Sequence, residues 1–328
     1  MEQQWERRHP FLELDHGAVE RLMRPAAPDS RVYSFAPLMS GHRNTNYRVD
    51  LAEPDGTRRS IVLRLYTADP SACSREAALA RLVGGAVPMP AVLHSAPDAD
   101  PPYAVVSWIE GVKLDDLLLT ADEQAIKAAI YAAGSVLAAI HRFSFPASGF
   151  LGPDLEVARP LQTGGEGWAA YVAWFLSERG VGERLGSDLT RRLGRLVSNS
   201  AARLDPLRDE RSLVHADYKP WNLLVRQDDA GWSVAGVLDW EFAFAGSPLF
   251  DLAIFLRQEA QHPPAYARGF EAAYRDAGGN LPPDWRALTK LLDVLNLCSM
   301  LDGTGLGKAF VEDARRLLVA TLDEFGVA

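Results

Sequence analysis

The amino-acid sequence predicts an α+β protein with two lobes, a small antiparallel β lobe and a larger, mostly helical lobe. Three segments of strand character occupy residues 31–66 and surround the turn sequence PDGT. In such a turn proline presets φ and glycine accepts a positive φ. From residue 111 onward, apolar residues recur at helical spacing. A chain of 328 residues is long enough for two domains, which we expect at residues 1–110 and 111–328.

Each lobe can be divided into elements by its local pattern. The β lobe is expected to contain one main helix, at residues 70–84, where Ala, Leu and Val repeat at helical spacing and Gly84 ends the run. The expected strands are residues 31–38, 47–53 and 58–66, with two more within residues 88–111. The second lobe is expected to be helical at residues 122–143, 167–180 and 187–204, and again from residue 250.

Composition and charge exclude several classes of protein. The formal net charge is −9, which argues against a partner with a phosphate backbone, such as nucleic acid. Two distant cysteines, Cys73 and Cys298, do not form a disulfide framework or a metal-binding spacing. The N-terminal residues are charged where a signal peptide would be apolar, and no run is long enough to span a membrane. We therefore expect a cytoplasmic protein without a membrane partner.

Polar residues interrupt an apolar segment in the second lobe. The sequence LVHADYKPWNLLV, residues 213–225, contains Asp217 and Asn222, and Asp239 ends the next strand candidate. Phosphoryl transfer from ATP needs a carboxylate to orient the attacking hydroxyl, and oxygen ligands that hold Mg²⁺ against the phosphates. A single Asp is more often a turn former or a helix cap, but the register H-x-D-x4-N followed by D-W-E favours a reaction centre.

These motifs resemble those of the aminoglycoside phosphotransferase and choline kinase-like family, whose fold is similar to that of protein kinases. The resemblance covers residues 34–255 and is most specific in HADYKPWNLLV and VLDWEFAFAGSPLFDLA. It implies that Asp217 is the catalytic base and that Asn222 and Asp239 bind Mg²⁺. It also implies a structural role for Asp251, which would tie the catalytic loop to the following helix.

Two charged residues upstream fit the same expectation. A strand-borne cation that binds phosphates and pairs with a helix-borne Glu is typical of kinases. Arg64 alternates with Leu63 and Leu65 on a predicted strand, and Glu76 lies early in the next helix. The alternative is a surface cation and a solvated helix charge. Protein kinases use Lys at this strand position, and Arg keeps the charge with a different, bidentate geometry.

The remaining nucleotide contacts rest on weaker signals. The loop SGHRNTN, residues 40–46, has one glycine, so Ser40, Gly41 and Asn44 are candidate phosphate contacts, although a plain hairpin loop explains the sequence as well. The resemblance places the adenine against backbone groups near Ser107 and Ile109. Backbone contacts of that kind leave little trace in a sequence.

Lys219 is the second candidate catalytic residue. A cation two residues after the base would neutralise charge on the migrating phosphoryl group, and the alternative is an exposed loop lysine. The role of Glu241, the third residue of D-W-E, stays open between assisting the metal and local bonding. Only twelve positions separate Asp239 from Asp251, which is too few for the activation segment of a protein kinase, so we expect a small alcohol as the acceptor.

The sequence therefore predicts a Mg²⁺-dependent enzyme that transfers the γ-phosphoryl group of ATP or GTP to a hydroxyl group of a small molecule. The acceptor could be an aminoglycoside-type antibiotic. Two alternatives remain: a metabolic kinase for choline, homoserine or a sugar, and an inactive nucleotide-binding regulatory module. Residues that could line an acceptor pocket, or equally belong to the core or to a solvated face, are Trp168, Tyr171, Trp174, Glu259, Glu271 and Asp293.

Overall fold

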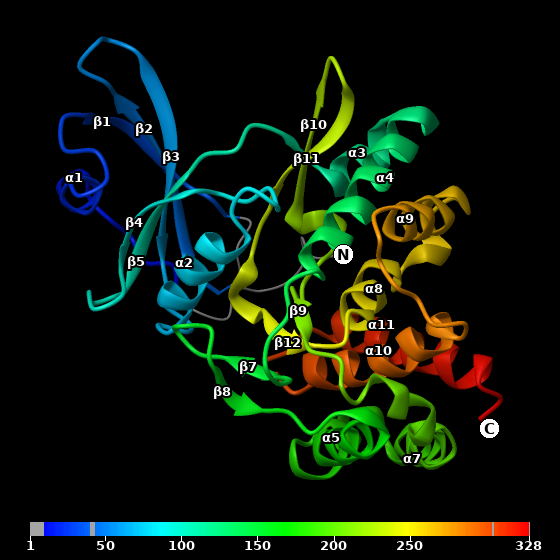
Figure 1. The fold of residues 1–328 in the computed structure, drawn as a ribbon. Coiled ribbons are helices and arrows are strands. Elements are labelled where there is room, and N and C mark those ends of the chain that lie inside the picture. Colours follow the sequence, from blue (N-terminus) through cyan, green and yellow to red (C-terminus); the bar gives the residue numbers. More distant parts are fainter. Residues whose placement is uncertain (1–9, 40–42, 304, 328) are drawn as a thin grey trace. The chain divides into compact units, whose positions relative to one another are not determined.

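The structure is a computed structural model that describes residues 10–39, 43–303 and 305–327. Its contacts divide the chain into two compact units (Figure 1). Unit 1 consists of Met1–Thr120, Gly152–Glu156 and Trp221–Glu241, and unit 2 consists of Ala121–Leu151, Val157–Pro220 and Phe242–Ala328. The domain boundary that the sequence predicted after residue 110 is not tested by this grouping and stays a prediction.

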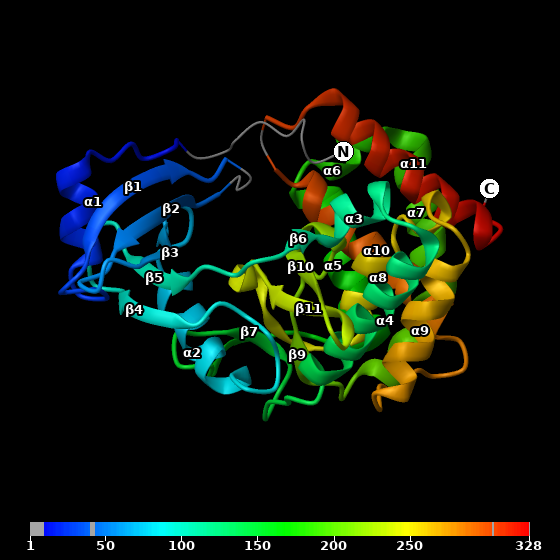
Figure 2. The ribbon, with the colours of Figure 1, turned by 90° about the horizontal axis from the view of Figure 1, so that it is seen from above.

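Unit 1 is built on an antiparallel sheet of five strands with the order β1-β2-β3-β5-β4 (Figures 1 and 2). The strands are β1 (Arg31–Pro37), β2 (Thr45–Ala52), β3 (Arg58–Leu65), β4 (Val92–Ala96) and β5 (Tyr103–Ser107). Together with the helices of unit 2, this sheet confirms the predicted α+β class.

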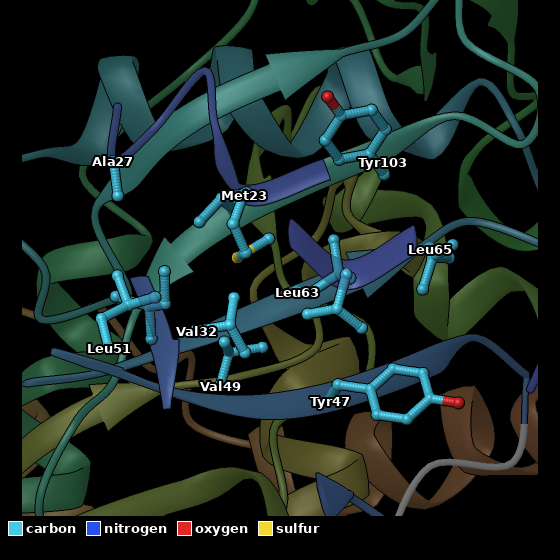
Figure 3. Packing of buried hydrophobic residues seen from close by; sticks show 12 residues of the cluster. Met23, Ala27, Val32, Tyr47, Val49, Leu51, Leu63, Leu65 and Tyr103 are labelled. Atoms are coloured by element: carbon cyan, nitrogen blue, oxygen red, sulfur yellow. The ribbon is translucent and has the colours of Figure 1, made fainter. Parts of the chain in front are cut away.

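One face of the sheet forms the apolar core of unit 1. Helix α1 (His16–Met23) begins at Asp15, whose carboxylate accepts a hydrogen bond from the backbone N–H of Ala18. It contributes Met23 to a buried cluster with Leu63 of β3 (Figure 3). Side chains alternate between the two faces of a strand, so this face takes every second residue of β3.

The opposite face of the sheet supports helix α2 (Ala72–Val83). Cys73 of α2 is fully buried in a second cluster with Ala104 of β5. Because Arg64 alternates with the core residues of β3, it lies on this second face. The fold thus places the strand-borne cation on the same side of the sheet as the helix that carries Glu76.

A second, three-stranded sheet in unit 1 carries the D-W-E segment. Its order is β11-β10-β6, with β6 (Val112–Lys113), β10 (Leu223–Asp228) and β11 (Gly231–Val237). The register pairs Leu223 with Val237. The backbone N–H of Leu238 then donates to the carbonyl of Asn222 at 2.9 Å, so Asn222 and Asp239 lie at the same end of the hairpin.

Unit 2 is mostly helical. Its helices of seven or more residues are α4 (Glu123–Ile140), α5 (Gly164–Glu178), α7 (Ser187–Ser200), η2 (Ala201–Leu207), α8 (Leu249–Leu256), α9 (Ala265–Asp276), α10 (Trp285–Leu301) and α11 (Lys308–Glu324). Helices α4 and α9 pack closely at Gly134, where a Cβ atom would lie 2.5 Å from the carbonyl oxygen of Phe270. No helix in the described part of the chain has the length and apolar character needed to cross a membrane.

Unit 2 also contains a small antiparallel sheet with the order β8-β7-β12-β9. Its strands are β7 (Gly149–Leu151), β8 (Val157–Pro160), β9 (Ser212–Val214) and β12 (Phe244–Gly246). The predicted catalytic loop begins directly after β9. The helix α8, which carries Asp251, begins three residues after the end of β12.

Candidate active site

The loop after β9 presents Asp217 and Lys219 together. The Nζ atom of Lys219 lies 2.9 Å from Oδ1 of Asp217, and both side chains are partly exposed, at 23% and 21%. Ala216, directly before Asp217, has φ of 66°, a left-handed conformation that costs a non-glycine residue roughly 1–2 kcal/mol. The loop is therefore held in a strained shape that exposes its carboxylate and its ammonium group as a pair.

A fully buried carboxylate holds this strained loop. Oδ2 of Asp251 accepts a hydrogen bond from the backbone N–H of His215 at 2.7 Å, and Oδ1 accepts one from Ala216 at 2.8 Å. His141 Nε2 lies 3.1 Å from the same carboxylate, and His141 Nδ1 lies 2.8 Å from the hydroxyl of Tyr274. The chain Tyr274–His141–Asp251 thus links α9 and α4 to the loop, which fits the structural role expected for Asp251.

In unit 1, Arg64 binds two carboxylates at once. Its Nη2 atom donates to Oε1 of Glu76 at 3.1 Å and to Oδ1 of Asp239 at 2.9 Å. The hydroxyl of Tyr66 donates to the other oxygen of Glu76 at 2.9 Å. The pairing of Arg64 with Glu76 was expected from the sequence, and the structure adds Asp239 to it.

Asn222 and Asp239 are the residues whose oxygens fit Mg²⁺. Asn222 is buried at the end of the short helix η3 (Pro220–Asn222) and is joined through its carbonyl to the residue before Asp239. In the described residues, no group of three or more His, Cys, Asp or Glu side chains forms a metal site. An amide oxygen and a carboxylate nevertheless suit Mg²⁺, because this ion usually takes one or two protein ligands and completes its shell with phosphates and water.

Burial and neighbouring charges shift the pKa values of Glu76 and Arg64. Desolvation raises the pKa of Glu76 from its usual 4.5 to about 7, although the positive charge of Arg64 opposes the shift. Burial also works to lower the pKa of Arg64, but the negative charges of Glu76 and Asp239 outweigh it and raise that pKa well above its usual value. Arg64 therefore remains charged, whereas Glu76 changes its charge near neutral pH.

We expect Glu76 to make the stability of the metal-free protein depend on pH. Its folded-state pKa is raised from 4.5 to about 7, so the folded protein keeps a proton that the unfolded chain releases between these values. Stability should therefore fall by about 3 kcal/mol as pH rises through this window. The measurement is the free energy of urea unfolding at pH 5 to pH 8, in EDTA, for the wild type and Glu76→Gln.

The Gln variant should lose the slope that Glu76 contributes, whatever its absolute stability. The exposed Glu110, which accepts a hydrogen bond from Nε1 of Trp108, provides a control, because Glu110→Gln should retain the slope. Equal slopes in wild type and Glu76→Gln would contradict the raised pKa of Glu76.

The other predicted nucleotide contacts are located in part. Ser40 and Gly41 lie outside the described residues. Asn44 is buried, and its amide donates to Glu241 at 2.9 Å. The Ser107 backbone N–H donates to the Ala91 carbonyl, and the Ser107 hydroxyl accepts from the Ala91 N–H, each at 2.9 Å.

Ile109 packs against the hairpin that carries Asp239. A Cβ atom added to Gly236 of β11 would lie 2.6 Å from Cδ1 of Ile109, so the Ile109 side chain lies directly over this glycine. The expected adenine-binding connector and the hairpin are therefore in direct contact within unit 1.

Three residues that contact the predicted site residues, or lie beside them in the structure, were not identified from the sequence. Tyr66 donates to Glu76, and Arg75 donates to the carbonyl of Glu241 at 3.0 Å. Lys113 lies 3.4 Å above the ring of Trp221, next to Asn222. The sequence offered a signal for two of them, because Tyr66 lies two residues after Arg64 and Arg75 directly precedes Glu76.

Four of the six residues considered for an acceptor pocket, Trp168, Glu259, Glu271 and Asp293, have defined partners. Trp168 is buried and its Nε1 donates to the carbonyl of Leu291, so it belongs to the core. Among the acidic candidates, Glu259 pairs with Arg286, Glu271 pairs with Arg275 and Arg286, and Asp293 pairs with Arg257. These three carboxylates are therefore already neutralised by arginines.

Comparison with known proteins places the chain among kinase-like transferases. The Phosphotransferase enzyme family matches residues 34–291. The GDP complex of wild-type aminoglycoside 2'-phosphotransferase-IIIa has a TM-score of 0.71 at 16% identity, over 95% of this chain and 100% of that chain. Macrolide 2'-phosphotransferase MphH from Brachybacterium faecium has a TM-score of 0.62 at 19% identity, over 92% and 97%.

Aminoglycoside phosphotransferase APH(4)-Ia has a TM-score of 0.67 at 19% identity, over 94% of this chain and 99% of that chain. A thermostable mutant of that protein has been solved in ternary complex with ADP and hygromycin B. At these identities the solved structures show a shared fold. No curated protein matches the chain significantly.

Proposed function

Because the chain belongs to the Phosphotransferase enzyme family, we propose that it transfers the γ-phosphoryl group of ATP or GTP to a hydroxyl group of a small molecule. The observation that carries this proposal is Arg64, which binds Glu76 and Asp239 with one nitrogen. In kinases a strand-borne cation paired with a helix-borne Glu, together with an Asp that binds Mg²⁺, positions the nucleotide phosphates.

Each residue has a role that follows from its chemistry. Asp217 orients the acceptor hydroxyl and accepts its proton, and Lys219, 2.9 Å away, stabilises charge on the transferred group. Asn222 and Asp239 hold Mg²⁺, which neutralises charge on the phosphates when it is bound. Arg64, oriented by Glu76, binds the phosphates of the donor. Backbone groups near Ser107 and Ile109 receive the base.

The acceptor in this proposal is a small alcohol with little positive charge. The acidic side chains considered for a cationic antibiotic, Glu259, Glu271 and Asp293, are paired with arginines. A polycationic aminoglycoside would have to displace these arginines, at the cost of leaving buried charge such as Arg257 unpaired. The pairing favours a neutral or singly charged acceptor, of the macrolide or sugar type, over an aminoglycoside.

The test is the release of ADP and GDP in the presence of Mg²⁺ across a panel of aminoglycosides, macrolides, choline, homoserine and simple sugars. We expect one acceptor to stimulate release, and Asp217→Asn to abolish the stimulation. Stimulation by aminoglycosides alone would contradict the proposed acceptor class. Failure of the wild type to bind either nucleotide with Mg²⁺ would contradict the phosphotransferase itself and favour a regulatory module.

We expect Asp239→Ala to abolish Mg²⁺-dependent nucleotide binding. The substitution removes the only carboxylate of the proposed metal pair and leaves Asn222 as a single neutral ligand. Nucleotide binding is measured by titration with and without Mg²⁺, and the wild type should bind more tightly with the ion. Asp228→Ala, at the exposed turn of the same hairpin, should behave as wild type. Retained Mg²⁺ dependence in Asp239→Ala would show that another group holds the metal.

A further inference from the structure

Glu241 is bound at both of its side-chain oxygens by one short segment. It follows Asp239 by two residues, in the turn η4 (Trp240–Phe242), and its side chain is buried. Nδ2 of Asn44 donates to Oε2 at 2.9 Å, and Nε of Arg43 lies 3.3 Å from Oε1. Residues 43 and 44 directly precede β2, so the carboxylate connects the D-W-E turn to the start of that strand.

The main chain of Glu241 is bound from a third direction. Nη2 of Arg75 donates to its carbonyl at 3.0 Å, and the same nitrogen donates to Oδ2 of Asp69 at 2.9 Å. Arg75 directly precedes Glu76 on α2. The helix therefore reaches the D-W-E turn by two routes, through Arg75 to the carbonyl of Glu241 and through Glu76 and Arg64 to Asp239.

These contacts disfavour a metal-ligand role for Glu241. A guanidinium group 3.3 Å from Oε1 and an amide at 2.9 Å from Oε2 already bind its oxygens. A metal ion at Glu241 would have to displace the amide of Asn44 from Oε2 or share Oε1 with Arg43. A buried carboxylate must be paired to be tolerated at all, and here the pairing is supplied by Arg43 and Asn44.

We propose that Glu241 is a positioning residue that fixes Asn44 and Asp239 relative to one another and thereby sets the affinity of unit 1 for the phosphates of a nucleoside triphosphate. This inference rests on the proposed function. Glu241 acts through Asn44 and through the turn that carries Asp239, and it does not bind the metal.

The test compares Glu241→Gln and Glu241→Asp with the wild type. Gln keeps the length of the side chain and an oxygen for Asn44 but loses the charge that binds Arg43, whereas Asp is too short by one methylene group to reach residues 43 and 44. We expect KM for the nucleotide to rise about tenfold in each variant, as for the loss of one contact to a buried charged group. The kcat at saturating nucleotide and the Mg²⁺ concentration for half-maximal activity should stay within about twofold.

Binding of ADP to the resting protein, followed by tryptophan fluorescence of Trp240 and its neighbours, gives a readout that does not depend on turnover. In a double-mutant cycle, Asn44→Ala should weaken ADP binding in the wild type and have little further effect in Glu241→Asp. Glu53→Gln is the matched control, because Glu53 pairs with Arg59 and follows the end of β2 that lies opposite Asn44; it should bind ADP as the wild type does.

Three results would overturn the inference. An increase in the Mg²⁺ requirement of Glu241→Gln, with unchanged KM for the nucleotide, would make Glu241 a metal ligand. Additive effects in the double-mutant cycle would remove the link to Asn44. A fall in the kcat of both variants with unchanged KM would place Glu241 in the chemical step. If the wild type itself binds no nucleotide, the proposed function fails and the inference fails with it, a result that differs from the other three.

Discussion

Asp217→Asn is expected to lower kcat by about two to four orders of magnitude, the usual contribution of a positioned general base. The amide keeps the size of the side chain but does not accept a proton from the acceptor hydroxyl. It also removes the charge that pairs with Lys219 at 2.9 Å. Nucleotide affinity should change by less than about threefold, because a group that acts on the acceptor in the transition state contributes little to binding of the donor.

The measurement is steady-state kinetics with the acceptor found in the panel, together with a nucleotide titration of the same protein sample. Lys219→Met separates the two members of the pair, since it keeps the carboxylate and removes the cation, and it should lower kcat less than Asp217→Asn does. A matched control is Asp228→Asn, at an exposed turn, which should leave both constants unchanged. An unchanged kcat in Asp217→Asn would remove the catalytic role of this residue.

The contact between Arg64 and Glu76 could be anticipated because it depends on local periodicity. Strand alternation places Arg64 opposite the core face of β3, and the helix that follows lies over that side of the sheet. A strand and the helix directly after it are neighbours in most folds. Alternation was still compatible with a surface cation, and the kinase pattern of a strand-borne cation and a helix-borne Glu supplied the pairing of Arg64 with Glu76.

Contacts between distant segments could not be anticipated in this way. Arg64 and Asp239 are separated by 175 positions, and Asn44 and Glu241 by 197. Nothing in the local pattern of either segment specifies the partner, because a polar residue in a strand or turn is compatible with solvent as well as with a buried partner. The role of Glu241 was open at the level of sequence for this reason, and its contact with Asn44 is the observation from which the positioning role is proposed.

The loop that carries Asp217 shows a second limit to prediction from the sequence. The spacing of Asp217 and Asn222 marked the segment, but the left-handed φ of Ala216 has no signature, since alanine rarely adopts that conformation. The conformation is imposed from outside the loop by Asp251, which lies 35 residues later and accepts the N–H of Ala216. Family resemblance, and not periodicity, supplied the structural role of Asp251.

Asp251→Asn is expected to lower the free energy of unfolding by roughly 3 kcal/mol. The carboxylate is fully buried and accepts the backbone N–H groups of His215 and Ala216 with its two oxygens. An amide has one oxygen, so one of these N–H groups would face an NH₂ group and lose its acceptor. His141, 3.1 Å away, would also lose the negative charge beside its Nε2 atom.

The same change should reduce kcat, because the conformation of Ala216 costs energy that Asp251 now offsets. Without both hydrogen bonds, the loop can relax from its left-handed φ, and Asp217 would leave the position from which it orients the hydroxyl. Urea unfolding and steady-state kinetics measure the two effects in one variant. Asp276→Asn removes a carboxylate that accepts a hydrogen bond from Tyr131 on the exposed surface of unit 2. It should change the free energy of unfolding by no more than about 0.5 kcal/mol and should leave kcat unchanged. If Asp251→Asn is destabilised but its kcat is unaltered, then Asp251 stabilises unit 2 without setting the position of Asp217. The strained conformation of Ala216 would in that case affect stability alone.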